Sequence, residues 1–253
     1  MVRDICKLWL KMADIQSSHL VPKAMYKYAI DPKTGKPNTV IINQKGTFPV
    51  VKQVTGDLLC WDCEQRIRKR GEDWMMRHIW NGKTNRFPLL DTLNVAVPVR
   101  PFGDALLYSA TACGIDADQL AYFALSVLWR GATREWRTGQ DSVYRITLGA
   151  YEEPIRQFLA GQAKFPQDVS VTVTVCTDIY SRLFYLPTPA KFPRHITATA
   201  FEFVALGVRF LIVTDKAAPK VICCVRSPER AILKRDCSSK AIASVAHLPI
   251  GRK

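Results

Sequence analysis

Two cysteines, Cys60 and Cys63, stand three positions apart at the start of an amphipathic stretch, and they most constrain how this chain can fold. Thiolates at this spacing can share one zinc ion, and a complete structural site needs four ligands. Cys6 is a third candidate, but the position three residues after it is Trp9, which cannot ligate. We therefore expect either a site completed by another group, for example Asp4 or water, or a site without zinc in which Trp9 packs where the ion would lie.

The stretch from Cys60 onward predicts a helix with one packed face and one basic face. Cys63, Ile67 and Trp74 recur at spacings of four and seven, which is typical of the apolar face of a helix. The cations gather on another side of this helix: Arg66, Lys69, Arg70 and Arg77. Gly71 is expected to shorten or break the helix, since glycine is a weak helix former.

The charge of the chain favours a polyanionic partner. The formal net charge is +14, and a field of this sign attracts polyanions, of which nucleic acid is the first candidate. Residues 1–90 carry 16 Lys and Arg against 8 Asp and Glu, whereas the other 163 residues carry 20 against 14. The basic density is therefore higher toward the N-terminus, although a basic balance can also serve solubility alone.

The length of 253 residues is enough to bury one good core or two small ones, and the 48% hydrophobic content predicts a globular protein. No membrane span is expected, because apolar stretches such as 203–213 fall short of the roughly 20 residues that cross a bilayer. The first residues show no secretory signal, so we expect a cytoplasmic protein with mostly reduced cysteines. Four of them are expected to be small buried hydrophobes: Cys113, Cys176, Cys223 and Cys224.

The order of patterns along the chain predicts an α+β protein in two parts, 1–90 and 91–253. Residues 87–103 contain three prolines and no period, which indicates a connector. Helices are expected over about 103–162, one opened by a capping box from Asp116 to Gln119 and one that begins at Glu152 and ends just before Gly161. An antiparallel sheet is expected over about 168–226, because residues 169–175 alternate strictly between valine and a hydroxyl residue.

The dipeptide Ser18-His19 carries the most suggestive chemistry. Hydrolysis of a phosphodiester needs a base that activates water, a divalent cation, and positive groups that hold the backbone. His19 could be the base, and Glu64 at the helix start could bind Mg²⁺, with Glu72 as a weaker second ligand. The alternative for His19 is a partly exposed, hydrogen-bonded residue at the end of a strand.

Several motifs occur in a characteristic order: Cys6, then Ser18-His-Leu-Val-Pro22, then Leu58-Leu-Cys-Trp-Asp-Cys63 and Glu64. This set resembles the HNH endonuclease family, whose pattern runs from an early Cys-x-x-Cys through Asp-His-Ile-x-Pro and an Asn to Leu-Cys-x-x-Cys-His. It is most similar to a branch with Ser-His-Ile-Ile-Pro-Lys and Leu-Cys-x-x-Cys-Glu, which Lys23, Tyr26 and Glu64 fit. The resemblance covers residues 5–75.

The resemblance implies a ββα-metal module, with a hairpin ending near His19, a helix beginning near Cys63 and a divalent ion, Mg²⁺ or Mn²⁺, between them. It implies that His19 activates the attacking water. Ser18 stands where the family has an Asp ligand, and Glu64 stands where it has a His ligand. Trp9 replaces the second cysteine of the first pair. The family Asn has no clear match, since Asn43 lies far upstream and Asp57 is only a stand-in.

Two functions follow from this resemblance. The first is a metal-dependent endonuclease that hydrolyses DNA, with His19 and Glu64 as catalytic residues, Ser18 and Glu64 at the catalytic metal, and Cys6, Cys60 and Cys63 at zinc. The phosphate contacts would come from Lys23, Arg66, Lys69, Arg70 and Arg77. The second is a degenerate module that binds nucleic acid without cutting it, because backbone binding needs only well-placed cations. A third possibility is a structural appendage to an unrelated C-terminal part.

The segment 129–137 interleaves two tryptophans with three arginines. One interpretation is a nucleic-acid surface, on which Trp136 stacks and Arg130, Arg134 and Arg137 contact phosphates. The other is that Trp129 belongs to the core while the arginines complement the dipole of the preceding helix. We favour the second.

Overall fold

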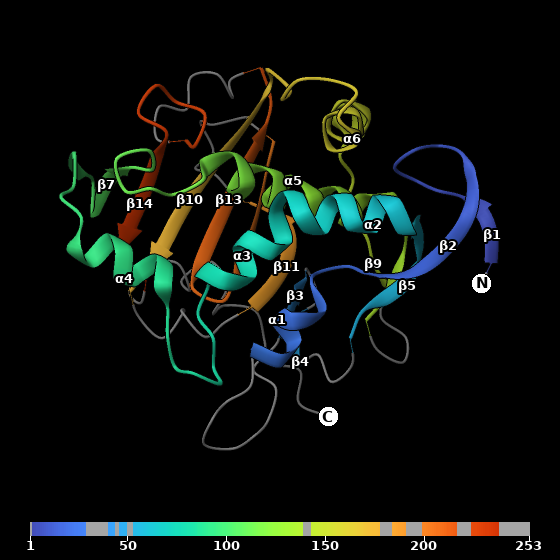
Figure 1. Cartoon of the computed structure of the whole chain (residues 1–253), viewed down its shortest axis with the longest axis horizontal. Coiled ribbons are helices and arrows are strands. Elements are labelled where there is room, and N and C mark those ends of the chain that lie inside the picture. Colours follow the sequence, from blue (N-terminus) through green and yellow to red (C-terminus); the bar gives the residue numbers. More distant parts are fainter. Residues whose placement is uncertain are drawn as a thin grey trace.

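The computed structural model describes residues 2–28, 40–43, 46–49, 53–138, 143–177, 184–190, 199–216 and 224–237, and for 40–43 and 46–49 it describes the backbone. The chain has the expected mixed α+β composition. Figure 1 shows a large sheet, a helix (α5, Ala117–Thr133) across one face of it, and the helix over residues 61–78 in front of α5. Among the described residues, no helix is both long and apolar enough to span a bilayer.

The N-terminal segment forms a small antiparallel sheet of β1 (Val2–Ile5), β2 (Met12–His19) and β5 (Thr55–Cys60), in the order β1-β2-β5. A short helix, α1 (Lys23–Tyr28), follows β2. A separate hairpin joins β3 (Val40–Asn43) and β4 (Gly46–Pro49). The β2–β5 pairing slips by one residue between Gln16 and Ser17, just before the Ser18-His19 pair.

The helix that follows β5 begins at Trp61 and runs through three parts. These are α2 (Trp61–Ile67), a π-helical turn η1 (Arg68–Glu72) and α3 (Asp73–His78). Gly71 lies inside the π turn and does not end the helix, so the expected break is absent there. A Cβ at this position would lie 2.8 Å from the backbone nitrogen of Phe123. Glycine is therefore required for the close approach of this helix to α5.

The C-terminal part is built on a seven-stranded sheet in the order β11-β12-β13-β10-β14-β7-β6. The strands are β6 (Arg100–Phe102), β7 (Ala105–Ser109), β10 (Val169–Cys176), β11 (Phe184–Pro189), β12 (Ala200–Ala205), β13 (Val208–Thr214) and β14 (Ala231–Arg235). The strands within the predicted range 168–226 pair antiparallel as expected, whereas β14, beyond that range, runs parallel to β10 and makes the whole sheet mixed. β13 and β14 lie on opposite sides of β10. A further pair, β8 (Trp136–Arg137) and β9 (Val143–Tyr144), stands apart.

The predicted connector over 87–103 is wrong, because these residues form α4 (Pro88–Val95) and β6. Pro88 occupies the first turn of α4, where no backbone donor is lost. Leu89 and Leu93, four apart, are buried. Pro101 sits in the edge strand β6, a position that tolerates a missing N–H. The expected helical region from 103 onward also begins with a strand, β7.

The helix ends follow the predicted signals. The Asp116 side chain accepts hydrogen bonds from the backbone N–H groups of Asp118 and Gln119, which confirms the N-cap of α5. The Gln119 amide bonds the Asp116 carboxylate instead of its backbone. Helix α6 (Glu152–Ala160) follows the 3₁₀ turn η2 (Gly149–Tyr151) and ends at Gly161, whose φ of 74° suits glycine.

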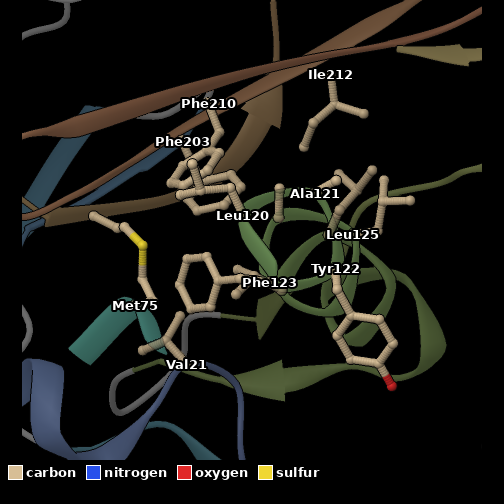
Figure 2. Packing of buried hydrophobic residues seen from close by; sticks show 14 of the residues in the cluster. Val21, Met75, Leu120, Ala121, Tyr122, Phe123, Leu125, Phe203, Phe210 and Ile212 are labelled. Carbon is tan, nitrogen blue, oxygen red and sulfur yellow. The ribbon is translucent and has the colours of Figure 1, made fainter. Parts of the chain in front are cut away.

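One hydrophobic cluster runs from Cys6 to Ile232 and so crosses the boundary that we predict near residue 90. Figure 2 shows Phe123 of α5 between Phe203 and Phe210 of the sheet on one side and Val21 and Met75 on the other. Of the cysteines expected to be buried, Cys176 and Cys224 are buried and Cys113 is partly buried, while Cys223 lies outside the described residues.

Candidate functional site

Three thiols lie close together at the start of α2. Cys6 follows β1, Cys60 is the last residue of β5, and Cys63 lies in the first turn of α2. The Sγ atoms of Cys6, Cys60 and Cys63 lie within 4.8 Å of one another, and all three residues are buried. The backbone N–H of Lys7 donates to the carbonyl of Leu58 at 3.1 Å, which holds the loop after β1 against β5. This group could hold a metal ion.

Hydrogen bonds to the sulfur of Cys6 give the thiols of this cluster different pKa values. The thiol of Cys63 donates to Cys6 Sγ, and the backbone of Cys60, Trp9 and Leu8 adds further hydrogen bonds. Together they outweigh burial and lower the pKa of Cys6 to about 5. The pKa of Cys63 is raised, first by its hydrogen bond to Cys6 and then by burial. The cluster thus favours one thiolate, and a bound metal would displace the remaining protons.

The protein supplies three ligands to this cluster, and within the described residues no fourth His, Cys, Asp or Glu joins them. Trp9 is 38% exposed, so much of its surface is open to solvent. Its packing in place of an ion stays a prediction. Asp4 is exposed, and its carboxylate accepts from the neighbouring Ile5 N–H at 2.6 Å. A fourth ligand from the alternatives above would therefore be water.

Ser18 and His19 face different surroundings at the end of β2. Ser18 is buried, and its Oγ accepts a hydrogen bond from the Leu59 N–H at 3.2 Å, which ties β5 to β2. The ring Nε2 of His19 lies 2.8 Å from Oε1 of Gln53. His19 is partly buried, so its placement matches the alternative of a hydrogen-bonded histidine at a strand end. Within the described residues, neither His19 nor Glu64 belongs to a group of three His, Cys, Asp or Glu ligands.

The buried guanidinium of Arg130 connects the two segments expected to flank a catalytic ion. Arg130 comes from α5, is 2% exposed, and donates through Nη1 to the backbone carbonyl of His19 at 2.9 Å. Through Nη2 it donates to the carboxylate of Glu72. Burial disfavours its charge, but Glu72 and then Glu64 outweigh burial, so the pKa of Arg130 is raised. A fixed cation thus faces both carboxylates.

This arrangement does not fit Mg²⁺. Glu72 is the ion-pair partner of Arg130, and the oxygen of Ser18 is already an acceptor for Leu59. Within the described residues, Glu64 has one buried oxygen, Oε1, without a hydrogen-bond partner, but a second cation there would lie in the field of Arg130. Arg130 was not expected in this role. An arginine within an otherwise apolar helix was the signal, because buried cations need partners.

The tryptophans of the segment 129–137 are not a nucleic-acid surface, because Trp129 and Trp136 are buried. Trp129 belongs to the core as we favoured, while the Nε1 of Trp136 donates to the Arg130 carbonyl at 2.8 Å. Arg134 donates to the carbonyl of Asp57 at 2.6 Å, and Arg137 is exposed. The arginines therefore do not act as a group at the end of α5.

The predicted phosphate-contacting residues separate into two kinds. Arg66 is partly buried, and its Nε donates to the carbonyl of Leu159 at 3.0 Å, which ties α2 to α6. The other four are exposed: Lys23, Lys69, Arg70 and Arg77. Their role in nucleic-acid binding stays a prediction. Comparisons with protein-family models, curated proteins and solved structures found no match to this chain.

Proposed function

We propose that this protein binds nucleic acid, preferably DNA, on an HNH-like ββα scaffold without metal-dependent cleavage. The observation that carries this proposal is Arg130. Its guanidinium bonds the end of β2 and the helix that follows β5, the two segments between which an HNH-type ion would bind. In this proposal the ion pair with Glu72 holds those segments together. The protein itself would supply the cation of the HNH-like scaffold.

The thiol cluster completes this scaffold as a structural zinc site. Thiolates are soft ligands that suit Zn²⁺, and the short spacing of Cys60 and Cys63 is typical of zinc knuckles. Cys6 is brought to them by the loop after β1, whose Leu8 carbonyl accepts a hydrogen bond from the buried Arg156 of α6. Zinc would therefore fix β1 and β5 at the start of α2. Water is the proposed fourth ligand.

Binding to the phosphate backbone rests on charge and exposure. Lys69, Arg70 and Arg77 project from η1 and α3, and Lys23 lies at the start of α1. Each phosphate contact releases condensed counterions, so the logarithm of the affinity should fall by about 0.9 per contact for each decade of salt. Arg66 is excluded from this set because it already binds Leu159.

The test is a titration of labelled duplex DNA at several salt concentrations, with cleavage followed on plasmid in Mg²⁺ and Mn²⁺. We expect steeply salt-dependent binding and intact plasmid. Replacing Lys69 and Arg70 by Ala should weaken binding and reduce the salt slope by about two. Lys164→Ala, an exposed lysine beyond α6, is the matched control. Undetectable binding at low salt would refute the proposal.

Cleavage is the second candidate, because Glu64 Oε1 is buried without a hydrogen-bond partner in the described part of the chain and His19 remains partly exposed. Under this alternative Mn²⁺ or Mg²⁺ would bring about nicking of the plasmid. The activity would be lost in His19→Ala and in Glu64→Gln while the fold persists. Metal-dependent nicking that both substitutions abolish would replace the first proposal by this one.

A further inference from the structure

Exposed apolar side chains concentrate around the thiol cluster. Trp61 is 62% exposed and Trp9 is 38% exposed, although indoles are usually well covered. Four further apolar residues of the β1–β2 hairpin are exposed with them: Val2, Ile5, Leu10 and Met12. Six exposed apolar residues on two segments that meet at the thiol cluster, two of them tryptophans, are typical of an interaction surface.

The two tryptophans lie on segments whose backbones both contact the sulfur of Cys6. The backbone of Trp9 lies within hydrogen-bonding range of Cys6 Sγ, and the N–H of Cys60 donates to the same sulfur at 3.4 Å. Trp61 is the next residue and opens α2. Figure 1 shows the β1–β2 hairpin and the start of α2 at the same end of the molecule. The thiol cluster therefore fixes the two indoles on neighbouring segments.

The charges beside the two indoles are mostly positive. In the loop after β1, the exposed Lys7 and Lys11 lie two residues before and two residues after Trp9 in the sequence. This loop contains no acidic residue. Along α2 and η1, Arg68 follows Trp61 by seven residues, which places it two turns away, about 10 Å along the same side.

Among the acidic residues nearby, the exposed Asp14 lies opposite Arg3 in the β1–β2 pairing. Asp62 lies in the first turn of α2, where its charge suits the helix dipole. Asp4 accepts a hydrogen bond from the Ile5 N–H. Arg68 has Asp73 at 3.6 Å, but both side chains are about half exposed, so this pair is weak. Lys69, next to Arg68, adds a further exposed cation.

We propose that this end of the protein binds unpaired bases of single-stranded nucleic acid, with bases stacked on Trp9 and Trp61 and phosphates held by Lys7, Lys11 and Arg68. The proposal rests on nucleic-acid binding as the proposed function. Stacking on an indole requires an open base face, which an intact duplex does not offer, so single strands are the occupant that fits. A protein partner would use the apolar residues but has no need of the flanking lysines.

The test compares a labelled single strand with a blunt-ended duplex of equal phosphate number. The single strand should bind more tightly, and Trp61→Ala should weaken that binding about tenfold, the order expected for one lost stacked base. Trp9→Ala should act in the same way, and Trp9→Phe should restore most of the affinity if the loop stays folded. Val97→Ala, an exposed apolar residue beyond the end of α4 and away from this hairpin, is the matched control. Duplex binding should stay unchanged in all four variants.

The outcomes separate the two proposals. Equal affinity for both probes, with no effect of the tryptophan variants, would overturn the stacking surface and leave nucleic-acid binding standing. Absence of binding to either probe would overturn both. Light scattering that shows dimers of the parent protein and monomers of Trp61→Ala would assign the surface to a second copy of this chain and overturn the stacking surface.

Discussion

The buried pair of Arg130 and Glu72 offers the sharpest test of the structure. The side chain of Arg130 is 2% exposed and that of Glu72 is 13% exposed. Arg130→Met keeps most of the apolar volume but leaves the Glu72 carboxylate without its cation and the His19 carbonyl without its donor. Breaking a buried pair from one side costs about 3–5 kcal/mol. This is a large share of the roughly 5–15 kcal/mol by which domains are stable.

The measurement is the free energy of unfolding in urea, followed by tryptophan fluorescence and circular dichroism together. Arg130→Met combined with Glu72→Leu should recover much of the loss, because an apolar pair of similar volume can replace a buried ion pair. Arg226→Met is the matched control, since Arg226 pairs with Asp118 at 2.9 Å on the surface, and it should cost at most about 1 kcal/mol. If Arg130→Met costs no more than this control, the argument for a buried cation at this site fails.

Three further predictions concern other sites. Gly71→Ala should destabilise the protein by about 1–3 kcal/mol in urea unfolding, because its Cβ would meet the backbone of Phe123 at 2.8 Å; an unchanged midpoint would contradict this packing. The purified protein should contain one zinc per chain by elemental mass spectrometry, and Cys63→Ser should lose it, whereas zinc retained by this variant would exclude the three-thiol site. Oxidised glutathione should form a disulfide between Cys176 and Cys237 by thiol–disulfide exchange, since their Sγ atoms lie 2.6 Å apart. Peptide mass mapping without reduction should detect this disulfide. Two unlinked thiols after unfolding and refolding in the oxidant would refute the prediction.

Local signals in the sequence predicted the elements that they define. The cap at Asp116, the glycine after α6 and the valine-rich strand β10 all lie where their patterns indicate, because each depends on neighbouring residues. The alternation in β10 predicts one solvated face, yet Ser170 and Thr172 are buried as well. This strand is fourth among seven, and its position in the sheet follows from pairings with distant segments.

The candidate metal centre was largely readable from the sequence, because the spacing of Cys60 and Cys63 restricts both to one site and leaves Cys6 as the remaining thiol of the N-terminal motif. The exposure of Trp9 was not readable, since it depends on how its loop packs against β5 and α6.

By itself, the sequence determined the α+β composition, the basic charge and the pair of cysteines at the start of a helix. Only the tertiary structure decided that Arg130 lies between the His19 carbonyl and Glu72. Its partner is 58 residues away along the chain, and α5 brings the two together through the close approach at Gly71. Whether a buried charge stabilises the fold depends on the groups around it. Those groups are brought together by helix packing, which a local sequence pattern does not predict.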